Sequence, residues 1–387
     1  MRRAPHVLCT WQHGGRFVSS ARRARGVPAS DLVIDVLDRL DAWMDVDALA
    51  AATGLPTSAL DVLLQGLEAH HLVEVEGQTC TSVSADPGIG PWADWSPAAH
   101  LFHLATRDVA FGRRASGVTS EAGPRPPAVL PPRGRPVLAL PAPALGDTTL
   151  RAALRDRRTH RQFGEGGIAA GDLATLLGLT FGVQAWAHPE EGRLALKTSP
   201  SGGARHSLEA YVWVRTVDDV PSGLYHYRPG DHALCALHDA TVPEAVTRWL
   251  PTQEGYEGAS VLVVLASELA RIAWRYRSAR AYRVVLIEAG HLAQTFCLAA
   301  TALGLAPFST AAMADTVVEH DLGIDGRTQP VFYAVGVGRR LAGEWQPHAG
   351  RPAPRLEVTD LGRSLADGGI TRRSREPRRR RRRERER

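Results

Sequence analysis

The sequence predicts an α+β domain built on one central sheet, and three observations carry this prediction. Helical and strand patterns alternate through the second half of the chain. The run from Val261 to Leu265 is apolar at every position, which is typical of a strand covered on both faces. The strand followed by G-x-G-x-x-G that opens a Rossmann unit is missing from the sequence, because the stretch from Gly164 to Gly167 is too short and misplaced.

Helices are expected where apolar residues recur at helical spacing, and strands where β-branched and apolar residues cluster. The expected helices cover residues 149–156, 170–181, 242–250, 279–303 and 315–322. The expected strands cover residues 208–215, 224–227, 259–267 and 331–337. These elements place the main domain at residues 147–343.

A separate small module is expected at residues 31–90. Helical spacing predicts a first helix from Asp31 and a second over residues 46–53, ended by Gly54. Thr57 or Ser58 can cap a third helix, and the alternating residues 72–80 turn at Gly77 like a wing hairpin. This is the element order of a winged helix-turn-helix.

DNA binding is the obvious function for such a module, but its charge argues against it. Residues 31–76 carry ten acidic side chains and one arginine, and the expected recognition helix 58–71 has no Arg or Lys. Since phosphate neutralisation supplies most nucleic-acid affinity, we expect no specific DNA binding. A structural or peptide-docking role fits this module better.

The net charge of +5 comes from the ends of the chain. Residues 1–30 hold six arginines and no acid, and are expected to form a basic tail or edge strand, with a transit peptide as the alternative. Residues 91–146, rich in Pro and Gly over 115–146, are expected to form a connector. Residues 344–387 are expected to form an extension ending in a disordered, arginine-rich tail.

Neither a metal site nor a membrane span is expected. Glu288 and His291 repeat the Glu-x-x-His motif of di-iron bundles, but the sequence holds no second copy, so a polar row buried in a helix packing or dimer interface is expected. No apolar run reaches the ~20 residues of a membrane span. The cysteines lack a C-x-x-C pair and fit a reducing cytoplasm. They are Cys9, Cys80, Cys235 and Cys297.

Two segments about forty residues apart predict a site for a phosphorylated ring cofactor. The first, RRTHRQF from Arg157 to Phe163, has arginines whose guanidinium groups can pair bidentately with phosphate oxygens. The second, PSGGAR from Pro200 to Arg205, is a small-residue turn that lets the backbone approach a flat ligand and donate N–H groups to it. A phosphate site together with a ring site indicates a phosphorylated heteroaromatic cofactor.

Five motifs in order resemble the nitroreductase-type flavoenzymes. They are RRTHRQF, PSGGARHSLEAYVWV, GLYHYRPGDHAL, AYRVVLIEAGHLAQTFCLAATALGL and PVFYAVGVGRR, and they span residues 149–340. More closely the chain resembles the SagB-type dehydrogenases, flavin oxidases that aromatise azoline rings in modified peptides; WSPAAHLFH at 95–103 also fits that group. The resemblance implies a central antiparallel or mixed sheet. It also implies an FMN-dependent dehydrogenase in the maturation of a ribosomally made peptide, oxidising azolines to azoles.

The resemblance further implies a homodimer with flavin at its interface, a precursor peptide as substrate and a cyclodehydratase as partner. Two other functions stay open. One is an NAD(P)H-dependent reductase of small electrophiles. The other is a non-catalytic peptide-binding or regulatory protein that uses the winged module.

By resemblance, an arginine-rich run and a distant arginine hold the phosphate and ribityl end of FMN. The resemblance also implies that a small-residue turn lies beneath the isoalloxazine ring. A loop that includes Ser309 would cover the dimethylbenzene or N5 side of that ring. Lys197, just ahead of the turn, would stabilise the anionic reduced flavin. The implied cofactor-binding residues are Arg157, Arg158, Thr159, Arg161, Ser201, Gly203, Ala204, Thr310, Ala311 and Arg339.

Arg275 and Tyr276 stand where azoline oxidases of this group have a Lys-Tyr pair. Oxidising an azoline requires removal of a proton from carbon while a hydride passes to flavin N5. Lysine can release its proton and act as a base, but arginine in practice cannot. Tyr276 is therefore the expected base, with Arg275 stabilising its phenolate. The alternatives are a different reaction, or an ordinary basic and aromatic start of a helix.

Overall fold

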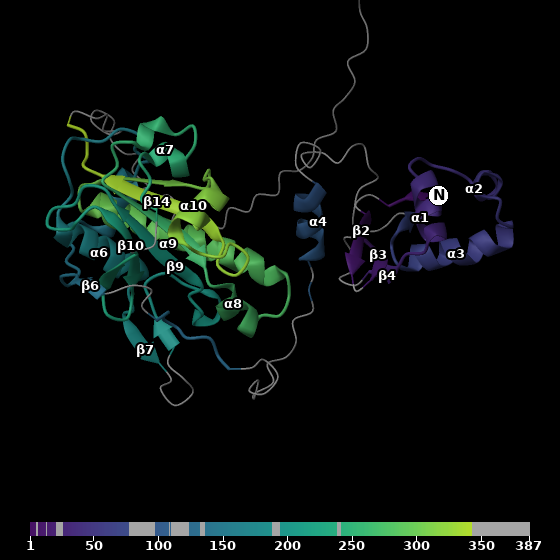
Figure 1. The fold of residues 1–387 in the computed structure, drawn as a ribbon, viewed down its shortest axis with the longest axis horizontal. Coiled ribbons are helices and arrows are strands. Elements are labelled where there is room, and N and C mark those ends of the chain that lie inside the picture. Colours follow the sequence, from purple (N-terminus) through teal and green to yellow (C-terminus); the bar gives the residue numbers. More distant parts are fainter. Residues whose placement is uncertain are drawn as a thin grey trace, which may run out of the picture. The chain divides into compact units, whose positions relative to one another are not determined.

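The computed structural model of the chain describes the following stretches (Figure 1): residues 1–4, 7–12, 14–20, 26–76, 97–107, 109, 124–131, 136–187, 194–237 and 241–342. The expected turn at Gly77, the residue Cys80 and the C-terminal extension 344–387 lie outside the described residues.

Residues 1–76 contain three helices in the expected order: α1 (Asp31–Arg39), α2 (Val46–Thr53) and α3 (Thr57–Ala69). The Ser30 side chain caps α1, and the Asp45 side chain caps α2 by accepting a hydrogen bond from the Ala48 N–H. Gly54 ends α2 in the left-handed region at φ 70°. The caps that the sequence offers therefore set both ends of α2.

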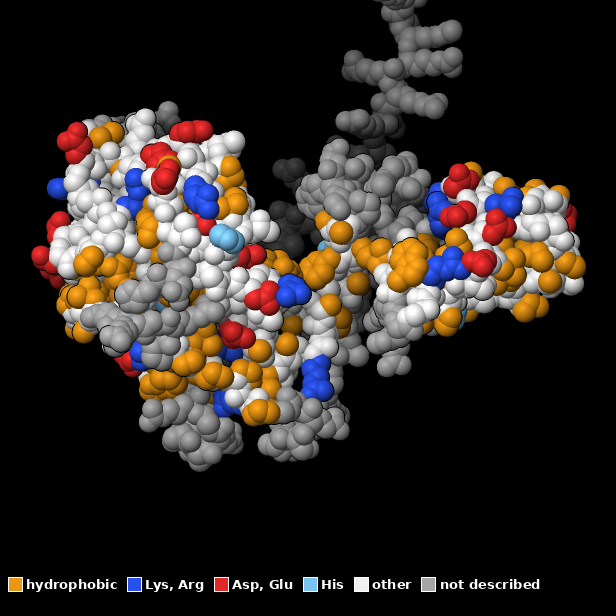
Figure 2. Space-filling view, viewed as in Figure 1, with side chains coloured by type: hydrophobic (Ala, Val, Ile, Leu, Met, Phe, Trp, Pro, Cys, Tyr) orange, Lys and Arg blue, Asp and Glu red, His pale blue; other side chains and the backbone are white. Residues whose placement is uncertain are grey.

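The basic N-terminal segment forms strands that pack onto these helices. Strand β1 (Arg2–Arg3) pairs with β5 (Val73–Glu74), and β2 (Val7–Gln12), β3 (Gly15–Ser20) and β4 (Val27–Pro28) form a second small sheet. Acidic and basic side chains lie side by side on the face of this module in Figure 2, because three arginines pair with acids of the helices and of β5. The pairs are Arg2–Glu74, Arg3–Asp38 and Arg16–Asp31.

This pairing bears on the expected wing. The described part of its first strand, β5, pairs with the N-terminal β1, and the residues expected to return as a hairpin lie outside the described part of the chain. The winged-helix assignment therefore stays a prediction. Of the structures expected for residues 1–30, strand is the one found, and its Val18 and Ala29 share the core of the three helices.

The main domain is organised around a seven-stranded sheet in which every neighbouring pair is antiparallel. The predicted α+β class with a central sheet is confirmed. Three of its strands were not expected, because runs of four or five residues are too short to show a clear alternation. The order is β13 (Ala306–Thr310), β14 (Val331–Gly338), β12 (Val261–Ser267), β9 (Leu208–Val214), β10 (Gly223–Arg228), β11 (Ala233–Ala236) and β6 (Pro136–Ala139).

Each central strand is buried on both faces, as its continuous apolar run predicts. In β9, Ala210 and Val212 face one core, whereas Tyr211 and Trp213 face the other. The first core is completed by α6 (Ala170–Phe181) and α9 (Arg280–Ala302), and the second by α7 (Val246–Trp249) and α10 (Asp315–Leu322), as Figure 1 shows.

The expected helix over 242–250 is shorter in the structure because a side chain fixes its start. The Glu257 carboxylate accepts hydrogen bonds from the N–H groups of Val246 and Thr247 at 3.1 and 3.0 Å. Helix α8 (Leu269–Arg275) was not expected at all. Strand β6 lies at the edge of the sheet although its residues were expected to belong to the connector, so the sheet starts before residue 147.

Helix α9 is the one described helix long and apolar enough to cross a membrane by length and composition. Half of its most apolar stretch is buried in the domain, as in the core helix of a globular protein. Arg283 and Glu288 interrupt its apolar sequence, and Glu288 is buried.

Gly336 in β14 allows the aromatic core below the sheet to close. A Cβ built on it would lie 2.3 Å from the Phe308 ring. The Phe308 ring stacks on Tyr256 with centroids 3.8 Å apart, so this packing restricts its movement away from an added Cβ.

Gly336→Ala should therefore lower the free energy of unfolding by about 1–3 kcal/mol, the usual effect of overpacking a core. Gly171→Ala is the matched control, since nothing lies within 4 Å of its Cβ position at the start of α6. This control should leave stability unchanged or raise it by up to ~1 kcal/mol. Urea unfolding measures both, and equal stabilities would contradict the described contact.

Candidate active site

The Ser201 turn lies immediately before β9 and has a tightly specified backbone. Residues Gly202–Ala204 form a single 3-10 turn, with Gly203 in the left-handed region at φ 62°. A Cβ on Gly202 would lie 2.6 Å from Val284 of α9, so only glycine lets the turn approach that helix.

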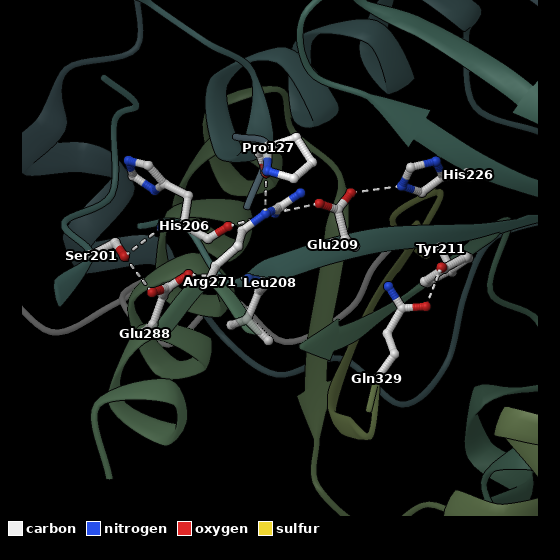
Figure 3. A network of polar contacts seen from close by, with 10 residues as sticks. All are labelled: Pro127, Ser201, His206, Leu208, Glu209, Tyr211, His226, Arg271, Glu288 and Gln329. Atoms are coloured by element: carbon white, nitrogen blue, oxygen red, sulfur yellow. Dashed lines mark hydrogen bonds and ion pairs between the residues drawn. The ribbon is translucent and has the colours of Figure 1, made fainter. Parts of the chain in front are cut away.

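A buried carboxylate on α9 holds this turn in place (Figure 3). Glu288 accepts a hydrogen bond from the Ser201 hydroxyl and another, at 3.3 Å, from the Leu208 N–H. The Ser201 oxygen in turn accepts the His206 N–H at 2.9 Å. Burial raises the pKa of Glu288. His291 Nδ1 lies 3.1 Å from the Pro200 carbonyl, so the expected polar row on α9 satisfies itself by holding the turn.

A second buried network lies behind the turn, also in Figure 3. Glu209 Oε1 is 2.5 Å from Arg271 Nη1, and its Oε2 is 2.7 Å from His226 Nε2. Arg271 also donates to the carbonyls of His206 at 2.9 Å and Pro127 at 2.8 Å. Burial alone would raise the pKa of Glu209, but the His226 hydrogen bond and the Arg271 charge hold that pKa below its ordinary value.

Lys197, the cation expected near the flavin, is half-buried beside these networks. Burial lowers its pKa to about 8, while the charges of Glu209 and Glu288 oppose that shift. The structure therefore places the Lys197 ammonium in the field of two buried carboxylates behind the turn.

The predicted catalytic pair lies on the predicted ring platform. Tyr276 follows α8, and its hydroxyl lies 3.0 Å from the position that a Cβ on Gly203 would occupy. The Arg275 guanidinium is 5.9 Å from the centre of the Tyr276 ring. Tyr276 is 38% exposed, so its hydroxyl is accessible to a ligand above the turn. Residues about seventy positions apart in the sequence therefore lie close together.

The expected phosphate-binding run is fixed at the start of β13. Arg157 ends α5 (Leu150–Asp156), and the His160 N–H donates to the Pro307 carbonyl at 3.0 Å. Arg158 Nη1 donates to the backbone carbonyls of Arg155 and Arg157 at 2.9 and 2.7 Å. Thr159 and Arg161 are exposed.

Arg339 lies beside this run. The Gly164 N–H donates to the Arg339 carbonyl at 2.9 Å, and Arg339 Nη1 lies 3.0 Å from the Cβ position of Gly166. Thus the two arginine motifs, which are far apart in sequence, lie side by side.

The loop after β13 is held by Gln253. The Thr310 hydroxyl donates to Gln253 Oε1 at 2.9 Å and accepts the Ala312 N–H at 3.1 Å. Ala311 is exposed. The Thr310 hydroxyl is therefore already engaged, and the loop presents mainly Ala311 and backbone to a ligand.

The sheet separates these groups into two ends. The start of β9 pairs with the end of β12 through Leu208 and Ser267, and Thr310 at the end of β13 pairs with Ala334. Ala306 pairs with Gly338 at the other end, next to Arg339. The sheet end at Leu208 and Ser267 lies beside Val331, which is seven residue steps along β14 from Gly338, roughly 23 Å. Within the described part of the chain, the Ser201 turn and the arginine run therefore lie at opposite ends of the sheet.

Sequence reasoning missed Glu209 and its partners, which lie behind the turn. Glu209 carried one usable signal, since an acid inside the otherwise apolar strand LEAYVWV needs a buried partner. Its partners His226 and Arg271 come from separate elements, so no spacing reveals them. Within the described residues, no group of three or more His, Cys, Asp or Glu side chains is placed to hold a metal ion.

Residues 154–339 match the model of the nitroreductase family. The chain is 31% identical over 199 residues to MJ1384, a nitroreductase relative from Methanocaldococcus jannaschii, across 51% of this chain and 95% of that protein. The chain therefore belongs to the nitroreductase family, which places it among oxidoreductases.

Two further similarities involve peptide processing. The trifolitoxin-processing protein TfxB of Rhizobium leguminosarum bv. trifolii is 32% identical over 148 residues, 37% of this chain and 39% of TfxB, so the chain spans well under half of that relative. The E. coli microcin synthetase McbBCD complex with truncated pro-MccB17 bound is 17% identical, covering 76% of this chain and 97% of that chain. Its TM-score of 0.39 is too low to carry an argument.

The buried His206 predicts acid sensitivity. Burial and then the Lys197 charge lower the His206 pKa to about 3 from 6.5. Between these pH values the unfolded chain binds a proton that the folded chain does not, so the free energy of unfolding should fall as pH falls through this window. His206→Asn should flatten the dependence, since asparagine tolerates the positive φ of 44°.

Urea unfolding at a series of pH values from about 7 to about 3 covers this window. An unchanged slope in His206→Asn would show that His206 is not held neutral.

Proposed function

We propose that this protein is an FMN-dependent dehydrogenase that oxidises azoline rings to azoles in a ribosomally made peptide, in the cytoplasm and beside a cyclodehydratase. The observation that carries the proposal is the position of Tyr276 and Arg275 on the Ser201–Gly203 turn. A candidate base thereby faces the surface where a flat ring can lie. The similarity to a trifolitoxin-processing protein supports a peptide substrate.

The residues present fit FMN at both ends. The N–H groups of Gly202 and Gly203 have no acceptor among the described residues, and they edge a turn without side chains. At the other end, Arg157, Arg161 and Arg339 form no ion pair with an acid in the described part of the chain. Unpaired guanidinium groups suit a phosphate, and free turn N–H groups suit the polar edge of a flavin.

FMN would supply the hydride acceptor of the reaction. Tyr276 would remove the proton from the ring carbon of the azoline, so that the substrate loses one proton and one hydride and gains a double bond. Arg275, always charged, would stabilise the tyrosine phenolate that acts as the base, and the proton transfer would leave neutral tyrosine. In this proposal Tyr276 takes the role of the base, and Arg275, which stands where azoline oxidases have lysine, supplies only the positive charge.

The distance between the two ends supports a homodimer. The neighbouring helices α5 and α9 expose large apolar side chains: Leu150 at 67%, Leu154 at 55%, Leu286 at 45% and Ile287 at 56%. Large apolar side chains exposed in this way are suited to burial against a second copy. Because α5 leads directly into Arg157, burying this surface against a second copy would place the arginine run at the interface. Each flavin site would then combine the arginine run of one copy with the Ser201 turn of the other.

An NAD(P)H-dependent reductase of small electrophiles is the second candidate. The similarity to MJ1384 favours this reductase, because the matched region covers 95% of that protein, which has too few further residues for a peptide-docking module. Rapid bleaching of the bound flavin by NADPH in the absence of peptide would favour the reductase.

Arg339→Ala should weaken FMN binding about tenfold to a hundredfold, since it removes a charge-assisted phosphate pair worth ~1.5–3 kcal/mol. Arg158→Ala should act in the same direction. Arg327→Ala, an exposed arginine away from the run, is the matched control. Quenching of FMN fluorescence on titration measures all of them. A wild-type protein that binds no FMN would refute the proposed function.

Tyr276→Phe should keep the fold and the bound flavin but slow flavin reduction by an azoline-containing model peptide ~10²–10⁴-fold, the usual contribution of a general base. Arg275→Lys should retain activity, because it restores the family pair. Anaerobic stopped-flow absorbance measures the reduction. If Tyr276→Phe reduces flavin at the wild-type rate, the base lies elsewhere and Tyr282, 42% exposed on α9, becomes the next candidate.

A further inference from the structure

The link between α8 and α9 carries Tyr276 and has few restraints of its own. Its residues 276–279 are all exposed. Helix α9 begins after Ala279, which has no side-chain group to cap the helix. The Tyr276 hydroxyl nevertheless lies 3.0 Å from the Cβ position of Gly203. Because helix ends fray where they are not capped, contacts with neighbouring elements decide how firmly Tyr276 is held over the turn.

Two arginines in the first turn of α9 bind the C-terminal end of helix α4 (Pro97–Ala105). Arg280 Nη1 donates to the Thr106 carbonyl at 2.8 Å, and Arg283 Nη2 donates to the His103 carbonyl at 2.6 Å. The last carbonyls of a helix have no partner within it, and they carry the negative end of its dipole. Two guanidinium groups three residues apart on α9 are therefore well placed to hold this helix end.

Aromatic side chains add to the contact between α4 and α9. The Phe102 ring of α4 meets the Tyr282 ring edge to face with centroids 5.7 Å apart, and Tyr282 meets Phe332 of β14 at 5.3 Å. The Arg283 guanidinium carbon lies 5.8 Å from the centre of the Phe102 ring. Edge-to-face ring pairs and cation–π contacts are both favourable. Helix α4 is thus joined to the sheet through the first turn of α9.

The connector is also bound on the other side of the link. Arg271 of α8 donates Nε to the Pro127 carbonyl at 2.8 Å. The Arg125 guanidinium carbon lies 5.8 Å from the centre of the Trp274 ring, which also belongs to α8. Residues of the expected connector therefore bind both of the helices that flank Tyr276.

We propose that Arg280 and Arg283 are positioning residues for the oxidation: by binding the end of α4 they fix the first turn of α9, and with it the link that holds Tyr276 over the ring platform. This inference rests on the proposed function for the role of Tyr276. Val284, next to Arg283, lies 2.6 Å from the Cβ position of Gly202, so this part of α9 also reaches the platform directly. Misplacing a reacting group by about 1 Å can cost ~10²-fold in rate, so loss of the α4 contact slows proton removal.

Arg283→Met should lower the maximal rate of flavin reduction by an azoline-containing model peptide ~10²-fold, while the peptide concentration at half-maximal rate and the FMN affinity stay close to wild type. Arg283→Lys keeps a donor for the His103 carbonyl and should restore most of the rate. Arg277→Met is the matched control, because it removes the same charge from an exposed position in the link itself. Anaerobic stopped-flow absorbance measures the rates, and FMN titration measures the affinity.

Equal loss of rate in Arg277→Met and Arg283→Met would overturn the proposal, in favour of a purely electrostatic effect on Tyr276. Loss of FMN affinity in Arg283→Met would overturn it too, because the arginine would then support the fold as a whole.

Ala105→Pro tests the same contact from α4, since proline in the last turn removes a helix hydrogen bond and displaces the carbonyls that the arginines bind. We expect the same loss of rate as in Arg283→Met. The double variant should be no slower than either single variant, because both changes break one contact. Independent losses that multiply in the double variant would contradict the proposal.

The position of Tyr276 can also be followed without the reaction. In full-length protein labelled with 3-fluorotyrosine, the Tyr276 resonance is assigned by its loss in Tyr276→Phe. Arg283→Met and Ala105→Pro should move this resonance toward its position in urea-unfolded protein, and an unmoved resonance in both would refute the positioning alone. A wild-type protein that binds FMN but leaves the azoline peptide unchanged would refute the proposed function, and the resonance would still report whether α4 holds Tyr276.

Discussion

The geometry of the candidate site depends on one buried carboxylate. Glu288 joins α9 to the turn through the Ser201 hydroxyl and to the first residue of β9 through the Leu208 N–H. A helix, a turn and a strand that are far apart in sequence thus share one acceptor. Its raised pKa indicates a carboxyl group whose charge is costly in this position, and its hydrogen bonds offset part of that cost. Removing the carboxylate would therefore release both the turn and the start of β9 from this shared acceptor.

Charge is arranged differently on the two sides of the turn. Behind it, Glu209 is matched by Arg271 and His226, and Lys197 adds a positive charge in the field of two carboxylates. On the partly exposed side of the turn, Arg205 and Arg275 have no acidic partner among the described residues. Paired charges in a buried position mainly fix geometry, whereas unpaired charges at a partly open surface are available to a ligand. This contrast separates the scaffold of the site from its recognition surface.

Long helices could be predicted from the sequence, whereas short strands could not. Helix α6 was predicted residue for residue because its twelve positions are strongly apolar, whereas β11, with four residues, shows too little alternation. Periodicity gives no sign that Tyr276 lies against Gly203 or that Arg339 pairs with Gly164, because these residues come from segments far apart in the sequence. The role of Glu288 was underestimated, because a polar residue on a core helix gives no sign of which distant turn it will hold.

The division of the site between two sheet ends has a physical consequence for how activity can be controlled. Arg339 and the Ser201 turn lie at opposite ends of one antiparallel sheet, so no side-chain motion can span the roughly 23 Å of strand between them. A ligand that needs both an arginine-rich end and the turn with Tyr276 must therefore extend along β13 and β14 or lie between two copies. The exposed leucines of α5 favour the second arrangement, since α5 ends at Arg157 and any surface that covers α5 also covers the run. Association would then create the complete site, and the monomer alone would hold only its two halves.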